Sequence, residues 1–122
     1  MTERDPSFAA QRIAADPQIS AWVTANAAMM RQRHDRFAAL FDTPGNPCQR
    51  VASGAFFAWV RHPWPGLSGW DAARRLARHA DLVCLPGEAF GPGMEAYLRL
   101  AFGNLPDALI PLAVARFREL PV

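Results

Sequence analysis

The sequence predicts an α+β domain, in which a small mixed or antiparallel sheet of about three strands is covered by helices and preceded by one long amphipathic helix. Three observations support this class. Apolar residues recur at helical spacing through the first third of the chain, and three short apolar runs bounded by glycine and proline come after them. A second helical pattern separates the first two runs, and a third follows the last run. The 122 residues suit a single domain with its own hydrophobic core.

The long helix has clear start and stop signals. Asp16 can cap its first turn through the side chain, and Pro17 suits the first helical position. The proline- and glycine-rich residues 43–47 end it. We expect one face to turn to the core, formed by Ile19, Trp22, Val23, Ala27, Met30, His34, Phe37 and Phe41. Residues 1–15 are then a short lead-in with at least one helical turn, and residues 16–122 are the domain.

The three apolar runs, residues 55–60, 82–85 and 97–102, are expected to be strands. Ser68 and Asp71 resemble a capping box at the start of the second helix, whose inward residues would be Ala73, Leu76, Ala77 and Ala80. A last helix is expected over residues 106–120. Pro111 lies inside it and removes a backbone hydrogen bond, which predicts a kink or a separate first turn.

Composition excludes several classes of function. Hydrophobic residues make up 51% and charged residues 20%, as in globular proteins. The net charge is only +2, and aspartates interrupt the arginine clusters on the helices, so we expect no nucleic-acid partner. No stretch is apolar enough to span a membrane, and the polar first residues lack a signal-peptide core. Cys48 and Cys84 have no metal-type spacing, which favours a reducing, cytoplasmic location, with Cys84 as a small core residue and no metal site.

The three histidines and three of the tryptophans give no catalytic site. His34, His62 and His79 fall on different elements, and His34 at its helical spacing is expected to be a packing residue. A cluster around one loop, Trp59, Trp64 and Trp70, is expected to belong to the core or to a domain interface. We therefore assign no catalytic, cofactor-binding or metal residue.

Arg99 is the most informative side chain. Strand alternation puts Leu98 and Leu100 on one face and points Arg99 to the other. A guanidinium in the middle of an apolar strand is rare unless it binds an anion, and its planar fork fits a carboxylate through two parallel hydrogen bonds. The alternative is an internal salt bridge to Glu88, Glu95 or another acid. Spacing alone leaves both open.

The region around Arg99 resembles the small-domain signature of class I/II aminotransferases, the fold-type I enzymes that use pyridoxal 5'-phosphate (PLP). The residues that carry the resemblance are Pro86-Gly87-Glu88-Ala89-Phe90-Gly91 and Tyr97-Leu98-Arg99-Leu100-Ala101-Phe102, and the strand at residues 54–60 and the helix with Trp22 also match. The resemblance implies that Arg99 binds the substrate's α-carboxylate. The loop from Pro86 to Gly93 lacks the lysine and hydroxyl residue of a phosphate-binding loop, so we expect it to be a shaped loop near the substrate.

The resemblance also implies what this chain does not supply. All 13 of its basic residues are arginine, and the family holds PLP covalently on a lysine. That lysine and the other PLP ligands belong to a large domain that no residue here matches. We therefore expect the isolated chain to be catalytically inactive and to form no covalent link to PLP. The partners would be an amino-acid or 2-oxo-acid substrate, the missing large domain or a partner chain, and a second copy in a homo-oligomer.

A second interpretation is a free-standing, non-catalytic α+β module that binds a carboxylate ligand or a protein partner. Its surface would be polar where the large domain of an aminotransferase would otherwise contact it.

Overall fold

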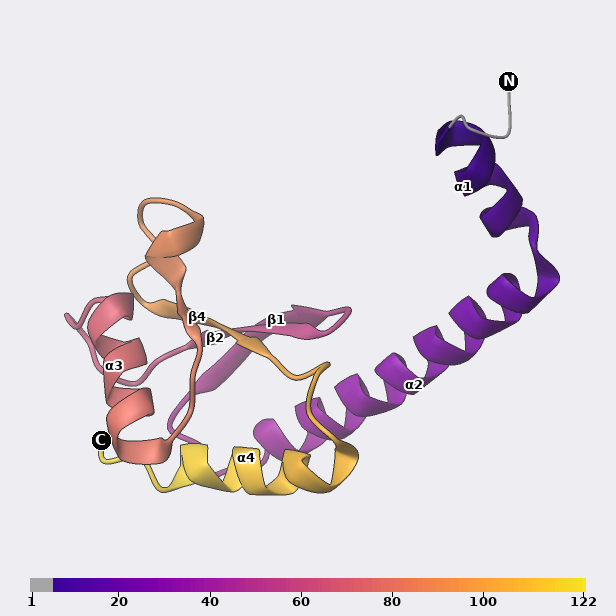
Figure 1. Ribbon diagram of the computed structural model, residues 1–122. Helices are drawn as coiled ribbons and strands as arrows, with labels where there is room; N and C mark the ends of the chain where they lie inside the picture. The colour runs from indigo at the N-terminus through magenta and orange to yellow at the C-terminus, as the bar shows by residue number, and fades with distance from the viewer. Residues whose placement is uncertain (1–5) are drawn as a thin grey trace.

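The computed structural model describes residues 6–122 (Figure 1). Residues 1–5 of the expected lead-in lie outside the described part. The elements in chain order are α1 (Pro6–Ala15), α2 (Pro17–Phe41), β1 (Gln49–Gly54), β2 (Phe57–Arg61), α3 (Gly69–Ala80), β3 (Leu85–Pro86), the 3₁₀ helix η1 (Gly87–Phe90), β4 (Tyr97–Ala101), the 3₁₀ helix η2 (Asp107–Leu109) and α4 (Ile110–Arg118).

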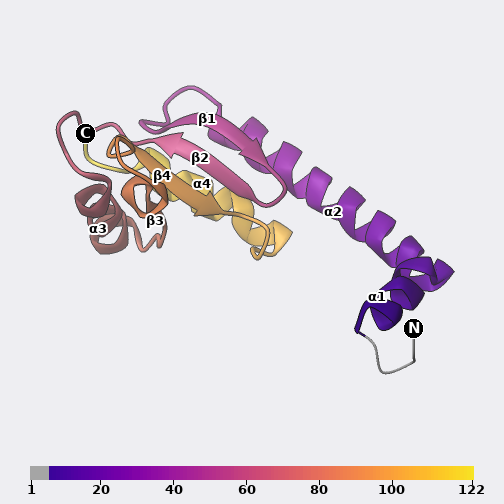
Figure 2. The same cartoon turned by 90° about the horizontal axis from the view of Figure 1, so that it is seen from above.

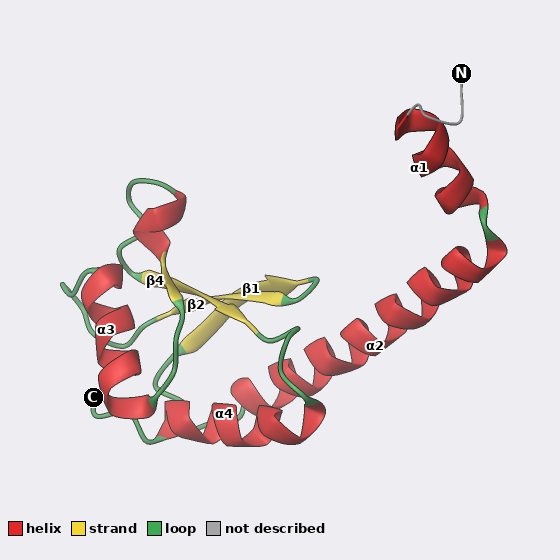
Figure 3. Ribbon diagram, viewed as in Figure 1, coloured by secondary structure: helices red, strands yellow, loops and turns green. Residues whose placement is uncertain are grey.

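The α+β class is confirmed, with four antiparallel strands in the order β1-β2-β4-β3. The end of α2 and all of α4 lie against one face of the sheet, and α3 lies at the edge formed by β3 (Figures 1 and 2). No α-helix of residues 6–122 covers the opposite face, which Figure 3 shows above the strands. The sheet therefore has one packed face and one open face.

The packed face follows from the alternation of β2 and β4. Ala58 and Val60 pair with Leu100 and Leu98, and all four side chains are buried. Beneath them, Phe37 of α2 stacks on Phe102 with ring centroids 4.9 Å apart. Burying each large apolar side chain contributes about 1.5–3 kcal/mol to stability. The rest of the core comes mainly from the helices and from the segments that connect or follow them, through Phe41, Cys48, Trp64, Ala72, Leu76, Ala80, Ile110, Val114, Phe117 and Leu120.

The start of α2 is as predicted, but its apolar face is only partly buried. The Asp16 side chain accepts a hydrogen bond from the Gln18 backbone N–H (2.8 Å), and Pro17 begins the helix. Phe37, Ala38 and Phe41 are its buried residues. The expectation that Ile19, Trp22 and Val23 turn to the core is wrong within the described residues, because this half of the helix extends away from the sheet (Figure 1). Trp22 is 64% exposed.

The sheet has one strand more than expected, because β1 has no apolar alternation in its sequence. It lies at the edge, with most of its side chains exposed. It joins β2 through a two-residue turn at Ala55 and Phe56, and Ala55 has a φ of +50°. The strand expected at residues 55–60 therefore begins two residues later. The strand expected at 82–85 is reduced to Leu85–Pro86.

The two remaining α-helices begin as the sequence indicates. The Ser68 side chain accepts a hydrogen bond from the Asp71 backbone N–H (3.0 Å) and caps α3. In that helix Ala72 is buried, whereas Ala77 is exposed. Pro111 lies in the first turn of α4, after the separate turn of η2, so the first helical turn is indeed distinct. No helix of residues 6–122 is both long and apolar enough to cross a membrane.

Candidate functional site

Arg99 lies at the centre of the open face. Its strand, β4, is an inner strand, and Arg99 pairs with Trp59 of β2 on one side and with Leu85 of β3 on the other. The neighbouring Leu98 and Leu100 are buried in the opposite direction, as the alternation predicts. The strand position fixes the direction of the Cα–Cβ bond of Arg99, and the guanidinium lies on the uncovered side of the sheet.

Two aromatic rings hold the Arg99 guanidinium. Its central carbon lies 4.1 Å from the ring centroid of Phe57 and 4.4 Å from that of Phe90. Phe57 begins β2, and Phe90 ends η1. Such stacking uses the flat faces of the guanidinium and leaves the N–H groups at its edge available. Among residues 6–122, no side chain or backbone carbonyl accepts a hydrogen bond from Arg99, and no acid pairs with it.

The rings on this face form one continuous layer. Trp59 stacks on Tyr97, with centroids 5.5 Å apart and planes at 20°, and it meets Phe90 edge to face, with centroids 5.9 Å apart. Arg61 lies over Tyr97, 5.3 Å from the ring centroid, and its Nη2 donates to the Tyr97 hydroxyl (3.0 Å). We call this set the aromatic–arginine layer; its members are Phe57, Trp59, Arg61, Phe90, Tyr97 and Arg99. It stiffens the surroundings of Arg99 without consuming that residue's donors.

Gly87 of the Pro-Gly-x-x-Phe-Gly motif sets the position of Phe90. A Cβ atom at Gly87 would overlap the Met94 carbonyl oxygen and lie 2.8 Å from that of Tyr97. Only glycine allows η1 to approach the segment before β4 this closely. The motif therefore acts through packing, because it brings η1, and with it the ring of Phe90, over Arg99.

The acids considered as partners of Arg99 have other surroundings. Glu88 Oε1 is buried without a hydrogen bond among the described residues, and it lies against Gly69 at the start of α3. The positive end of a helix favours a carboxylate there. Glu95 is exposed, and its backbone carbonyl accepts a hydrogen bond from His62. The structure thus contains no internal salt bridge between Arg99 and either glutamate.

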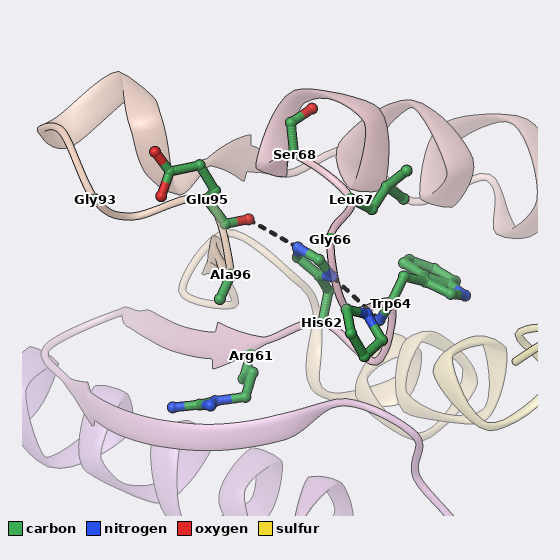
Figure 4. Close-up of a pocket in the computed structure, with 10 residues that line it drawn as sticks. Arg61, His62, Trp64, Gly66, Leu67, Ser68, Gly93, Glu95 and Ala96 are labelled. Carbon is green, nitrogen blue, oxygen red and sulfur yellow. Dashed lines mark hydrogen bonds between the residues drawn. The ribbon is translucent and has the colours of Figure 1, made fainter.

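A hollow of about 410 Å³ lies beside the aromatic–arginine layer, between the loop after β2 and the segment before β4 (Figure 4). Buried His62 joins its two walls. The Trp64 backbone N–H donates to His62 Nδ1 (3.3 Å), so Nε2 carries the proton and donates to the Glu95 carbonyl (2.8 Å). His62 therefore has a structural role: it links the loop after β2 to the segment that leads into β4.

The remaining candidates are placed mostly as structural residues. Trp64 is buried, and its Nε1 donates to the Pro121 carbonyl (3.1 Å), whereas Trp70 is exposed. Burial raises the pKa of the Cys48 thiol to about 12 and that of Cys84 to about 11. Among residues 6–122, no three metal-ligating side chains lie together.

Sequence reasoning did not find the partners of Arg99. Phe57 is far from Arg99 along the chain and is brought to it by the sheet register, and Phe90 of the neighbouring motif is brought over it by the path of η1. Arg61 was also missed, although its alternation with Val60 could have placed it on the open face. His34 was expected to be a packing residue; it does contact Phe102, but its ring nitrogens bond to Ser53 and Asp35.

Comparison with known proteins supports the resemblance found in the sequence. The family model for aminotransferase class I and II matches residues 5–117. The chain belongs to this family. LL-diaminopimelate aminotransferase of Parabacteroides distasonis is 42% identical over 64 residues, which cover 52% of this chain and 15% of that protein. Aromatic aminotransferase ISS1 of Arabidopsis thaliana is 29% identical over 101 residues, or 82% of this chain and 25% of that protein.

Solved aminotransferases share the fold. The crystal structure of the aromatic aminotransferase of Pyrococcus horikoshii superposes with a TM-score of 0.70 and 24% identity, covering 91% of this chain and 29% of that one. The chain thus spans less than a third of the length of these relatives. PLP is the cofactor of class I and II aminotransferases. Because the chain has no lysine, its own residues do not fit the covalent attachment that the family uses.

Proposed function

We propose that residues 16–122 are the C-terminal, small domain of a PLP-dependent aminotransferase, which moves an amino group from an amino acid to a 2-oxo acid. In this domain Arg99 binds the α-carboxylate of both substrates. The observation that carries the proposal is the guanidinium clamped between Phe57 and Phe90, with its N–H edge unbonded within residues 6–122. A half-buried arginine of an inner strand, held in this way, suits an anionic ligand better than an internal ion pair.

The clamp explains how the chain would contribute to the reaction. A carboxylate can accept two parallel hydrogen bonds from a guanidinium edge, which fixes both its position and its plane. The two rings restrict rotation of the guanidinium, so less rotamer entropy is lost when the ligand binds. Orienting the substrate is the role we assign to Arg99, which transfers no proton.

PLP would be held by residues that this chain does not contribute. When bound, it supplies the electron sink of the family's chemistry. We expect residues 1–122 alone to form no covalent link to it, since no lysine is present. The intact enzyme would be a homo-oligomer in the cytoplasm, and the two unpaired cysteines support the reducing compartment.

The exposed half of α2 supports a contact with a large domain or a second copy. Ile19, Trp22 and Val23 are 39%, 64% and 52% exposed and lie on one helical face, and Ile13 of α1 is 57% exposed. An apolar surface of this kind favours association. A free-standing module, the second interpretation, would be expected to carry polar residues there.

The test is a pair of arginine-to-lysine variants in a full-length enzyme that carries residues 16–122 as its small domain. Arg99→Lys keeps the charge but loses the two-pronged geometry. Transition-state binding should therefore weaken by about 1.5–3 kcal/mol, and kcat/KM for the amino acid and for the oxo acid should fall together. The matched control is Arg78→Lys, at an exposed position of α3 outside the aromatic–arginine layer, which should leave kcat/KM unchanged. PLP binding should be normal in both. If Arg99→Lys destabilises the fold at full kcat/KM, Arg99 is a structural residue and the proposal fails.

A further inference from the structure

β1 runs beside α2 (Figure 2), and a second group of reactive side chains joins these two elements. Ser53 Oγ lies 2.7 Å from His34 Nε2, and His34 Nδ1 lies 3.0 Å from Asp35 Oδ1. Both distances are within the range of a nucleophile, its base and the group that orients the base. The same order of groups, hydroxyl, imidazole and carboxylate, defines the serine nucleophiles of hydrolases on unrelated folds.

Arg50 and Asp35 flank the pair of Ser53 and His34 and favour one direction for its protons. Its guanidinium binds Asp42 through two hydrogen bonds, and Nη1 donates to Ser53 Oγ at 2.7 Å. The bond to Asp42 raises the pKa of Arg50, so the guanidinium stays protonated and can only donate. Ser53 accepts from Arg50, and its own proton can be donated to His34 Nε2. An ionised carboxylate can only accept, so His34 Nδ1 donates to Asp35, and Nε2 is then the acceptor when the ring is neutral.

This protonation pattern is the one that a serine nucleophile requires. The hydroxyl proton points at the lone pair of the base, and the opposite ring nitrogen donates to a carboxylate that stabilises the imidazolium as it forms. Arg50 adds a positive charge beside Ser53 Oγ, which favours transfer of the hydroxyl proton to His34. Asp35 is 70% exposed, so its share is smaller than that of a buried carboxylate.

The group opens onto a hollow of about 500 Å³, which is large enough for a small organic ligand. Ser53 and His34 line it, and the remaining wall is largely apolar, with Ala27, Met30 and Phe56. Its one charged wall residue within residues 6–122 is Arg31. At the rim, Ala55 has a φ of +50°, a strained conformation for a residue other than glycine. Because the wall is largely apolar and its charged residue is a cation, the hollow suits an apolar acyl group rather than a positively charged ligand.

We propose that Ser53 is a nucleophile, activated by His34 and oriented through Asp35, that hydrolyses esters of small apolar carboxylic acids. Ser53 Oγ attacks the ester carbonyl and passes its proton to His34 Nε2. The bond to the alcohol oxygen breaks, and that oxygen takes the proton from His34. Water then attacks the acyl-serine with His34 as base, the bond between the acyl carbon and Ser53 Oγ breaks, and His34 returns the proton to Ser53 Oγ as the carboxylic acid leaves. This activity uses none of the residues of the aromatic–arginine layer and stands independently of the proposed transaminase role.

The test uses the 122-residue chain with p-nitrophenyl butyrate and, separately, with a fluorophosphonate that labels activated serines by losing fluoride. We expect ester cleavage above the buffer rate and a phosphonate adduct that peptide mass spectrometry places on Ser53. Ser53→Ala should abolish both and His34→Gln should slow both by about 100-fold or more, as expected for loss of a general base. The matched control is Ser20→Ala, an exposed serine of α2, which should react as the unmodified chain does.

His34 contacts the core residue Phe102, so His34→Gln can weaken the fold. Asp35→Asn separates loss of activity from loss of stability. Its side chain is exposed, so the substitution should leave the thermal midpoint unchanged. We expect it to lower kcat by about fivefold or more with KM unchanged, since it acts through the base. Cleavage at the buffer rate, adducts spread over several serines, or equal labelling of Asp35→Asn and the unmodified chain would overturn the proposal.

Discussion

Replacement of Gly87 by alanine should destabilise the fold and disturb the Arg99 clamp together. The new Cβ would overlap the Met94 carbonyl oxygen and lie 2.8 Å from that of Tyr97. Both obstacles are backbone atoms, so relief requires η1 to move away from the segment before β4. Overpacking of this kind costs about 1–3 kcal/mol, and two backbone contacts place Gly87→Ala near 2–3 kcal/mol. For 122 residues this lowers Tm by about 8–12 °C.

The assay is thermal and urea unfolding followed by circular dichroism, with Gly54→Ala as the matched control. A Cβ at Gly54 meets nothing within 4 Å, so this variant should stay within about 0.5 kcal/mol of the unmodified chain. In parallel, the Nε–Hε resonance of Arg99 should shift in Gly87→Ala, because the ring of Phe90 moves with η1. Equal unfolding midpoints for the two variants and an unshifted Arg99 resonance would refute the role given to this glycine.

Three further outcomes are expected. Asp81 ends α3 with a φ of +53°, so Asp81→Gly should raise the free energy of unfolding by about 0.5–1 kcal/mol, measured by urea unfolding; a loss of stability would contradict this. Burial raises the pKa of Cys48 to about 12 and of Cys84 to about 11, which favours the thiol form in the fold and lowers stability as pH rises above about 9. Between pH 8 and 10 the unmodified chain should lose about 1 kcal/mol per cysteine more than the variant with both replaced by alanine, and parallel curves would argue against buried thiols. The unmodified chain should associate in analytical ultracentrifugation. The double variant Trp22→Ser, Val23→Ser should shift it toward monomer with unchanged Tm, because both side chains are exposed. An unmodified chain that stays monomeric at high concentration would favour an autonomous module.

Local signals in the sequence determined several elements of this fold. Asp16 and Pro17 start α2 through a side-chain hydrogen bond and a preset backbone angle, and Ser68 caps α3 in the same way. The side chains of β4 alternate between the two faces, so Leu98 and Arg99 had to point in opposite directions once the strand formed. These features involve residues within one helical turn or one strand, which is why their pattern is visible without the tertiary structure.

The tertiary structure decided the features that depend on distant residues. β1 could not be found from its pattern, because an edge strand with few buried side chains needs no apolar alternation. The exposure of Trp22 depends on where the sheet ends beside α2, and not on helical spacing. The clamp of Phe57 and Phe90 on Arg99 requires the β2–β4 register and the close approach of η1, which no single segment encodes. The sequence by itself determined that an arginine faces away from the core; the packing of distant rings around it decided that its hydrogen-bonding edge stays free.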